Sequence, residues 1–266
     1  MEQVFLLSPA FCGGRRASIL LNPKSEAETT LEMRAGRLSL GRAFAFMSGL
    51  YFRGKLAYAQ RFGEALIITP TRGLQPPDLP FSLALLREFA VGDVSLDNPE
   101  YRTALERDVV ALAARIGRRA RVILLGSVAS GKYVDVLLPI LGERLRYPVS
   151  FIGRGDMSRG GLLLRSAASG DELDYVPLAA GVRPRGPRPP KLDPATRVPP
   201  HDAKSASWGP RVAVSWGHET DRPRDRAHRG IVEPVLSTGA PRAKGLDPVV
   251  DIRLRQRPRV HGRPRS

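Results

Sequence analysis

The densest group of residues able to do chemistry lies at positions 153–161, with the sequence GRGDMSRGG. Arg154 and Arg159 can each hold a phosphate or a carboxylate through paired hydrogen bonds. Asp156 can orient an arginine, bind a sugar hydroxyl or act as a base, and Ser158 adds a hydroxyl. The glycines allow the backbone to approach a ligand closely. We predict a ligand site here, and a tight loop with a structural arginine–aspartate pair is the alternative.

A second group has the spacing of a phosphate-binding loop. Residues 126–132, GSVASGK, match the pattern G-x-x-x-x-G-K between an expected strand and an expected helix. Backbone amides after Gly126 would surround a phosphate, and Lys132 would reach its terminal oxygens. The next residue should be Ser or Thr to hold magnesium, but it is Tyr133, and no apolar strand ending in aspartate supplies the second metal-holding motif. A glycine turn at a helix start that happens to carry Lys132 is the preferred interpretation, and such a turn would still be able to bind a phosphate. A degenerate nucleotide hydrolase is an alternative.

Further arginines and acids lie beside another expected strand, residues 65–69. Arg72 and Asp78 follow it in the sequence PTRGLQPPD. Arg53 lies near the start of a helix expected over residues 50–62, whose apolar stripe leaves Arg53 and Lys55 on other faces. Ligands of open α/β sheets bind beyond the carboxyl ends of the strands. We therefore expect Arg53, Arg72 and Asp78 to share a pocket with the 153–161 group, a solvated arginine being the alternative for Arg53.

The elements that would position these residues alternate between strand and helix. Short apolar runs predict strands, and runs with apolar residues at helical spacing predict helices. Strands are expected at 4–8, 43–49, 65–69, 121–125, 147–152 and 162–164, and helices at 25–36, 50–62, 81–89, 98–117 and 131–146. The alternation predicts a three-layer α/β domain with a mainly parallel sheet.

The composition changes near residue 185. Of 266 residues, 42% are hydrophobic, which allows a packed core, and the net charge of +16 favours phosphate-bearing or acidic partners. Residues 1–185 have the mixed composition of a folded domain, whereas residues 186–266 are rich in proline and arginine and are expected to be mostly disordered. The tail is either a basic extension that binds nucleic acid or sequence with little selected structure, such as a shifted reading frame.

Several classes of chemistry are disfavoured. All four histidines lie beyond residue 200, so an acid or base in the 1–185 domain must be a carboxylate, tyrosine, lysine, Cys12 or water. The acidic residues have no metal-ligand spacing, and a single cysteine forms neither a metal site nor an intrachain disulfide. One cysteine and a start without a cationic leader predict a cytoplasmic protein. No apolar run approaches the roughly 20 residues needed to cross a bilayer.

Three segments together resemble a family of small bacterial and phage α/β domains of unknown function. They are the opening strand that runs into Cys12-Gly13, the sequence GLYFRGKLAYA at 49–59, and the sequence ITPTRGLQPPD at 68–78. A later strand with glycine and tyrosine is similar to Gly126 and Tyr133. The resemblance covers about residues 4–165. It implies a compact α/β sandwich and a link to nucleic-acid or nucleobase metabolism.

Three functions follow as expectations. The first is binding of a phosphate-bearing ligand, a nucleotide or nucleic acid, at the carboxyl ends of the strands. Under this function the ligand is bound by Arg53, Arg72, Gly126, Lys132, Arg154, Ser158 and Arg159. Asp78 and Asp156 orient the ligand or act as base. The second is a non-enzymatic nucleic-acid-binding protein that uses the basic tail, and the third is the degenerate nucleotide hydrolase. The residues do not decide whether the protein is an enzyme, and they indicate no cofactor.

Overall fold

The computed structural model describes residues 2–129, 131–179, 186–187, 189–190 and 192. The chain divides into two units, Met1–Arg211 and Val212–Ser266. All described residues belong to the first unit. The expectation of a disordered tail over 186–266 falls almost entirely outside the described residues. The five described residues between 186 and 192 lie beside the 152–161 segment, since the carbonyl oxygen of Pro187 is next to Gly153 and the Leu192 side chain is next to Gly161.

The strands form one mostly parallel sheet. Its order is β3-β2-β1-β4-β5-β6. The four central strands, β2, β1, β4 and β5, run parallel to one another. The edge strands are antiparallel, β3 to β2 and β6 to β5. The strands are β1 (Gln3–Leu7), β2 (Glu64–Ile68), β3 (Leu74–Gln75), β4 (Arg121–Leu125), β5 (Leu145–Pro148) and β6 (Tyr175–Pro177). The prediction of an α/β domain with a mainly parallel sheet is confirmed for the described residues.

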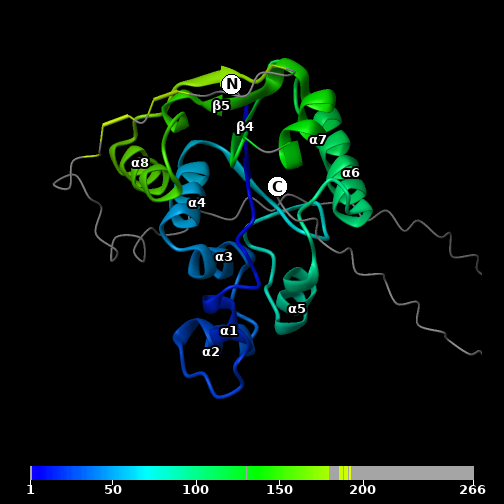
Figure 1. Cartoon of the computed structure of the whole chain (residues 1–266), viewed down its shortest axis with the longest axis vertical. Coiled ribbons are helices and arrows are strands. Elements are labelled where there is room, and N and C mark those ends of the chain that lie inside the picture. Colours follow the sequence, from blue (N-terminus) through cyan, green and yellow to red (C-terminus); the bar gives the residue numbers. More distant parts are fainter. Residues whose placement is uncertain (1, 130, 180–185, 188, 191, 193–266) are drawn as a thin grey trace, which may run out of the picture. The chain divides into compact units, whose positions relative to one another are not determined.

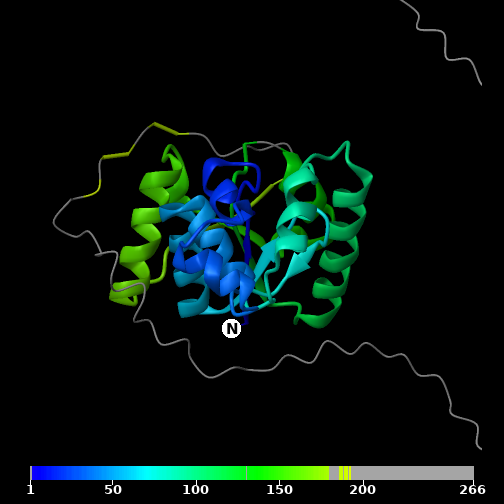
Figure 2. The ribbon, with the colours of Figure 1, turned by 90° about the horizontal axis from the view of Figure 1, so that it is seen from below.

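Helices cover both faces of the sheet (Figure 2). α4 contacts β1 and β2 and packs on α8, whereas α6 and α7 pack on each other, with α7 on β5. The α-helices are α1 (Arg15–Leu21), α2 (Glu28–Arg34), α3 (Leu40–Ser48), α4 (Leu50–Phe62), α5 (Leu83–Val91), α6 (Pro99–Arg115), α7 (Gly131–Leu141) and α8 (Asp156–Ser169), and two 3₁₀ turns are η1 (Gly142–Arg144) and η2 (Val149–Phe151).

The central strands are apolar throughout because helices cover them on both sides. Val4–Leu7 of β1 and Val122–Leu125 of β4 are fully buried, and Leu7 is in register with Leu125. Figure 1 shows β1 running from the N-terminus toward α1, α2 and α3, which lie beyond the carboxyl ends of the strands. These helices and the loops after β1 and β4 therefore surround the end of the sheet at which a site was expected.

Two expected strands are helices. Residues 43–49 lie in α3, where Leu40, Ala43, Phe44 and Met47 are buried at helical spacing. Residues 162–164 lie in α8, where the buried positions Gly160 and Leu163 also have helical spacing. Short apolar runs fit either element, and the tertiary packing decides between them. The prediction of a strand at 162–164 was wrong because α8 needs an apolar face against α4.

α4 and α8 pack unusually closely through two glycines. A Cβ atom added to Gly54 would lie 2.6 Å from the carbonyl oxygen of Gly160, and one added to Gly160 would lie 2.8 Å from the backbone of Leu50. No larger side chain fits between the helices at these positions. This packing sets the start of α8 beside the start of α4.

Candidate functional site

The strand order reverses between β1 and β4. From β1 the chain passes through α4 to β2 on one side, and from β4 it passes through α7 to β5 on the other. Because such crossovers are right-handed, α4 and α7 lie on opposite faces. A topological switch point of this kind opens a crevice beyond the strand ends, and ligands of α/β proteins bind there. The residues that follow β1 and β4 are therefore the first place to look for a site.

Ser8 and Gly126 are the residues that immediately follow these two strands. A Cβ atom on Gly126 would lie 3.0 Å from the Cβ atom of Ser8. Glycine therefore allows the loop after β4 to pass directly over Ser8. Both residues are buried, and Ser8 is 8% exposed.

Lys55 reaches Ser8 from α4. Its Nζ atom lies 2.9 Å from Ser8 Oγ and donates to the Ser8 carbonyl oxygen at 2.6 Å. The residue is only 1% exposed, and Nζ lies 4.6 Å and 4.7 Å from the ring centroids of Tyr51 and Phe52. Sequence periodicity had placed Lys55 off the apolar face. It is instead among the largest fully buried side chains of the described part.

The charge of Lys55 has little compensation. Among the described residues it forms no ion pair within 4.0 Å. Burial lowers the pKa of the Lys55 ammonium to about 7, because desolvation disfavours the charged form, and the more distant carboxylate of Asp156 opposes this shift. Near neutral pH the amine is therefore present in both protonation states.

Tyr133 reaches the same place from α7 on the other face. Tyr133 is 4% exposed, and burial raises its pKa, while an interaction of its hydroxyl with the Ser8 side chain opposes the rise. The position that should carry the magnesium ligand of a phosphate loop is thus packed into the core beside Ser8. The Lys132 amine lies over the Tyr133 ring, with Nζ 5.2 Å from the ring centroid. The Asp135 carboxylate lies next to Gly131 at the start of α7.

The residues of the 153–161 group do lie together, and their contacts are largely to nearby backbone. Arg154 Nε donates to the Ser150 carbonyl oxygen at 2.9 Å, and its Nη1 lies 3.2 Å from the Ser158 hydroxyl. Arg159 donates to the Phe151 carbonyl oxygen at 3.2–3.3 Å and lies 3.7 Å from Asp156. Residues 153–155 connect η2 to α8, and residues 156–161 begin α8. The arginines of the group tie these two elements together.

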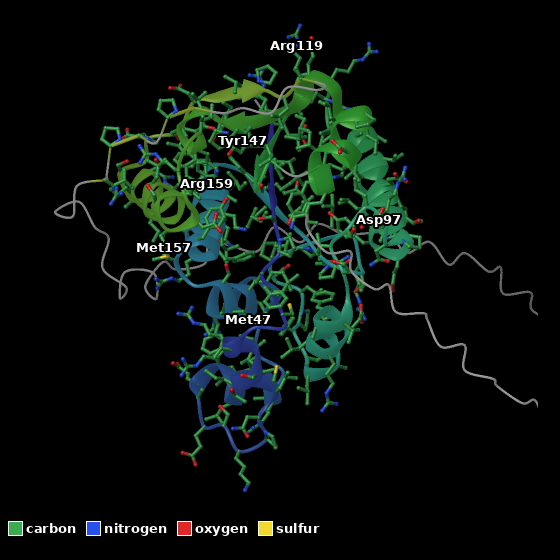
Figure 3. The ribbon with its side chains drawn as sticks, viewed as in Figure 1. Met47, Asp97, Arg119, Tyr147, Met157 and Arg159 are labelled. Atoms are coloured by element: carbon green, nitrogen blue, oxygen red, sulfur yellow. The ribbon has the colours of Figure 1, made fainter. Side chains whose placement is uncertain are left out.

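Arg159 also connects this group to Lys55. It lowers the pKa of Tyr51, against the larger rise that burial causes, and the Tyr51 ring adjoins the Lys55 amine. Arg159 and Tyr147 lie on the adjoining elements α8 and β5 (Figure 3). The Tyr51 hydroxyl is buried without a well-formed hydrogen bond among the described residues. A row of polar groups therefore runs from Ser8 through Lys55 and Tyr51 to Arg159.

Two of the expected site residues lie elsewhere. Arg72 forms a two-point ion pair with Glu88 of α5, with Nε–Oε1 2.8 Å and Nη2–Oε2 2.5 Å, near the β2–β3 edge of the sheet. Asp78 is exposed in the turn that packs against the start of α3. β2 and β5 are separated by β1 and β4, so the structure does not bring Arg72 to Arg154.

Arg53 lies on α4 within the candidate region. It is partly buried, and its Nε atom has no hydrogen-bond partner among the described residues. It is one residue from Phe52 and two from Lys55, so its side chain leaves the helix on a different face from the amine. Its place in the site stays a prediction.

Two hollows in the described part lie away from the switch point. One, of about 410 Å³, is lined by residues 113, 114, 116, 118, 143 and 144, where α6 and η1 end. The other, of about 230 Å³, lies between α1, α2 and α5. The shared pocket expected from the sequence is not one of them. No cluster of three or more potential metal ligands occurs in the described ranges.

Comparison with known protein families, curated proteins and solved structures finds no match. The family resemblance expected from the sequence therefore stays a prediction. No helix within the described ranges is long and apolar enough to cross a membrane.

Sequence reasoning missed Ser8 and Lys55. Ser8 appeared only as the last residue of an apolar run, and Lys55 as one of several cations outside an apolar stripe. Because α4 is covered by β1, β2, α3 and α8, the face that carries Lys55 is buried as well. The sequence did hold a signal for Ser8, which is a polar residue at the end of an apolar strand and is followed by Pro9. Residues at the carboxyl ends of strands in α/β sheets commonly contact ligands.

Proposed function

We propose that the protein binds a small phosphate-bearing ligand of the nucleotide class beyond the carboxyl ends of β1 and β4. The observation that carries the proposal is the switch point itself, with Lys55 buried beneath it. Gly126 follows β4, Lys132 is in the first turn of α7, and Asp156 and Arg159 are in the first turn of α8.

Helix starts support an anionic ligand. α4 and α7 each end just before a parallel strand, and α8 begins beside Leu50 of α4, so all three begin at the carboxyl end of the sheet. The first backbone N–H groups of a helix lack intrahelical partners, and the helix dipole adds partial positive charge there. Anions, phosphates included, bind at such ends.

Positive side chains add to this field. Arg16 Nη1 donates to the Phe46 carbonyl oxygen at 3.0 Å and lies beside Gly49, at the start of α4. Lys132 is in the first turn of α7, and Arg159 is in the first turn of α8. The carboxylates at the same helix starts, Asp135 and Asp156, would be positioned to contact ribose or base polar groups rather than phosphate.

The degenerate nucleotide hydrolase has less support. Tyr133 occupies the magnesium-ligand position of the loop and packs against Ser8, so its hydroxyl points into the core. Nucleic-acid binding by the basic tail concerns residues outside the described part, and it stays a prediction.

Binding tests the proposal directly. Calorimetric titration of the full chain with AMP, ATP, inorganic phosphate and adenosine should give binding for the phosphate compounds and much weaker binding for adenosine. Lys132→Ala should weaken nucleotide binding by about 10-fold or more, the cost of one charged hydrogen bond. Lys24→Ala is the matched control, because it removes the same charge from an exposed position between α1 and α2.

Binding should also weaken as salt concentration rises, because the contact is largely electrostatic. If no phosphate compound binds, or if Lys24→Ala and Lys132→Ala weaken binding equally, the site proposed here is wrong.

A further inference from the structure

Ser8 and Lys55 form a hydroxyl–amine pair of the kind that activates a nucleophile. The 2.9 Å distance between Ser8 Oγ and Lys55 Nζ is a hydrogen-bond distance. A neutral amine has one lone pair and two N–H groups. In the structure Lys55 Nζ donates to both Ser8 Oγ, at 2.9 Å, and the Ser8 carbonyl oxygen, at 2.6 Å. Once the amine is neutral, its lone pair is able to accept the Ser8 hydroxyl proton across the same 2.9 Å. Both contacts of the amine are thus satisfied by a single residue.

The surroundings favour the neutral amine over the ammonium ion. The tip of Lys55 lies beside the rings of Tyr51 and Phe52 and the end of β1, and it has no carboxylate within ion-pair distance among the described residues. An isolated ammonium ion in such a place is costly, so the amine gives up its proton more readily than a surface lysine does. A neutral lysine beside serine is able to act as a general base.

Ser8 also has the position that a nucleophile needs. It follows the last residue of a central strand at the switch point, and it retains 8% of its exposed surface while Lys55 retains 1%. Ser8 is therefore the less completely buried member of the pair. The start of α7, where Tyr133 interacts with Ser8, supplies backbone N–H groups able to stabilise developing negative charge.

We propose that Ser8 is a nucleophile and Lys55 its general base, in hydrolysis of an acyl ester. In the first step the Ser8 Oγ proton passes to Lys55 Nζ while Oγ forms a bond to the carbonyl carbon. The carbon–oxygen bond to the leaving alcohol then breaks, and the alcohol takes the proton from Lys55. Water then attacks the acyl carbon while Lys55 Nζ accepts its proton. The bond between that carbon and Ser8 Oγ breaks, Oγ takes the proton back from Lys55, and the carboxylic acid leaves.

The proposed ester hydrolysis takes place where the phosphate-bearing ligand is proposed to bind. It rests on the proposed function only in that this ligand would carry the ester. The groups that face the pair and titrate or carry charge are Tyr51 on α4, Tyr133 on α7, and Asp156 and Arg159 on α8. Burial brings the pKa of Lys55 to about 7, and it raises the pKa values of Tyr51 and Tyr133.

The test uses a small serine-directed probe, diisopropyl fluorophosphate, on the full chain. Intact-mass measurement and peptide mapping should show one adduct, located on Ser8. The rate of labelling should rise with a midpoint near pH 7. Lys55→Met should slow labelling by about 100-fold, the usual contribution of a general base. Ser8→Ala should abolish the adduct.

Ser169→Ala is the matched control, because Ser169 is exposed at the C-terminal end of α8, away from Ser8, and its removal should leave labelling unchanged. No adduct at any pH, or an adduct that persists in Ser8→Ala, overturns the inference. So does an adduct on Ser8 whose rate has no midpoint between pH 6 and 8, and this readout holds even where Lys55→Met does not fold. Labelling without any nucleotide binding would contradict only the proposed function, and protection of Ser8 by AMP would place both at one site.

Discussion

Lys55 Nζ, on α4, lies 2.9 Å from Ser8 Oγ, at the end of β1, and Lys55 forms no ion pair among the described residues. The contact joins the helix that leads into β2 to the strand at the centre of the sheet. It has consequences for stability as well as for chemistry.

Stability should depend on pH through Lys55. An unfolded lysine holds its proton up to about pH 10.4, whereas in the folded chain the pKa of Lys55 is about 7. Between these values the unfolded state binds more protons, so the free energy of unfolding rises with pH. We expect a rise from pH 7 to 9 of at most about 1.4 kcal/mol per pH unit, measured by urea unfolding. Lys55→Met should lose this rise, and an unchanged pH dependence in the variant would contradict the lowered pKa.

The contact between α4 and α8 should tolerate no side chain at Gly54. Because a Cβ atom there would lie 2.6 Å from the Gly160 carbonyl oxygen, the helices would have to separate. Gly54→Ala should destabilise the protein by about 1–3 kcal/mol, measured by thermal or urea unfolding. The control is Gly161→Ala, whose Cβ atom would make only an ordinary 3.4 Å contact with Arg165. That variant should be neutral or gain about 0.5–1 kcal/mol, because alanine favours helix. Equal losses in both variants would refute the close packing.

Arg72 should have little influence on ligand binding. It is paired with Glu88, and its side chain is 52% exposed. Hydrogen bonding from Arg72 holds the pKa of Glu88 below its usual value, so the pair contributes above pH 4–5 and is lost as pH falls. Arg72→Ala should cost about 0–1 kcal/mol and leave nucleotide affinity within about 2-fold of wild type. A loss as large as that of Lys132→Ala would return Arg72 to the site.

Tyr133→Thr should not create a magnesium-dependent nucleotide hydrolase, although it completes the phosphate-loop pattern. Tyr133 fills core space next to Ser8 and is 4% exposed. The substitution should leave a cavity and destabilise the protein by about 2–4 kcal/mol. Tyr133→Phe keeps the ring and should cost much less. Phosphate release from ATP with and without Mg²⁺ is the measurement, and a magnesium-dependent gain in Tyr133→Thr would support the hydrolase hypothesis.

The sequence was informative wherever local pattern controls structure. Apolar runs identified β1, β2 and β4, and apolar residues at helical spacing identified α6, where the Asn98 side chain accepts from the Glu100 backbone N–H. The same reasoning failed at residues 43–49 and 162–164, because a short apolar run has the same composition in a strand and in a buried helix. The 153–161 group was correctly expected to lie together, since its members are near one another in the chain.

By itself the sequence determined the alternation of strands and helices, the mainly parallel sheet and the glycine turn after β4, because these depend on neighbouring residues and on periodicity. Tertiary structure decided that Ser8, Lys55 and Tyr133 meet, that Arg72 pairs with Glu88, and that Arg154 and Arg159 bind backbone carbonyl groups. The physical reason is that burial of a lysine depends on what covers its helix. α4 is enclosed on several sides, and its charged face became part of the core.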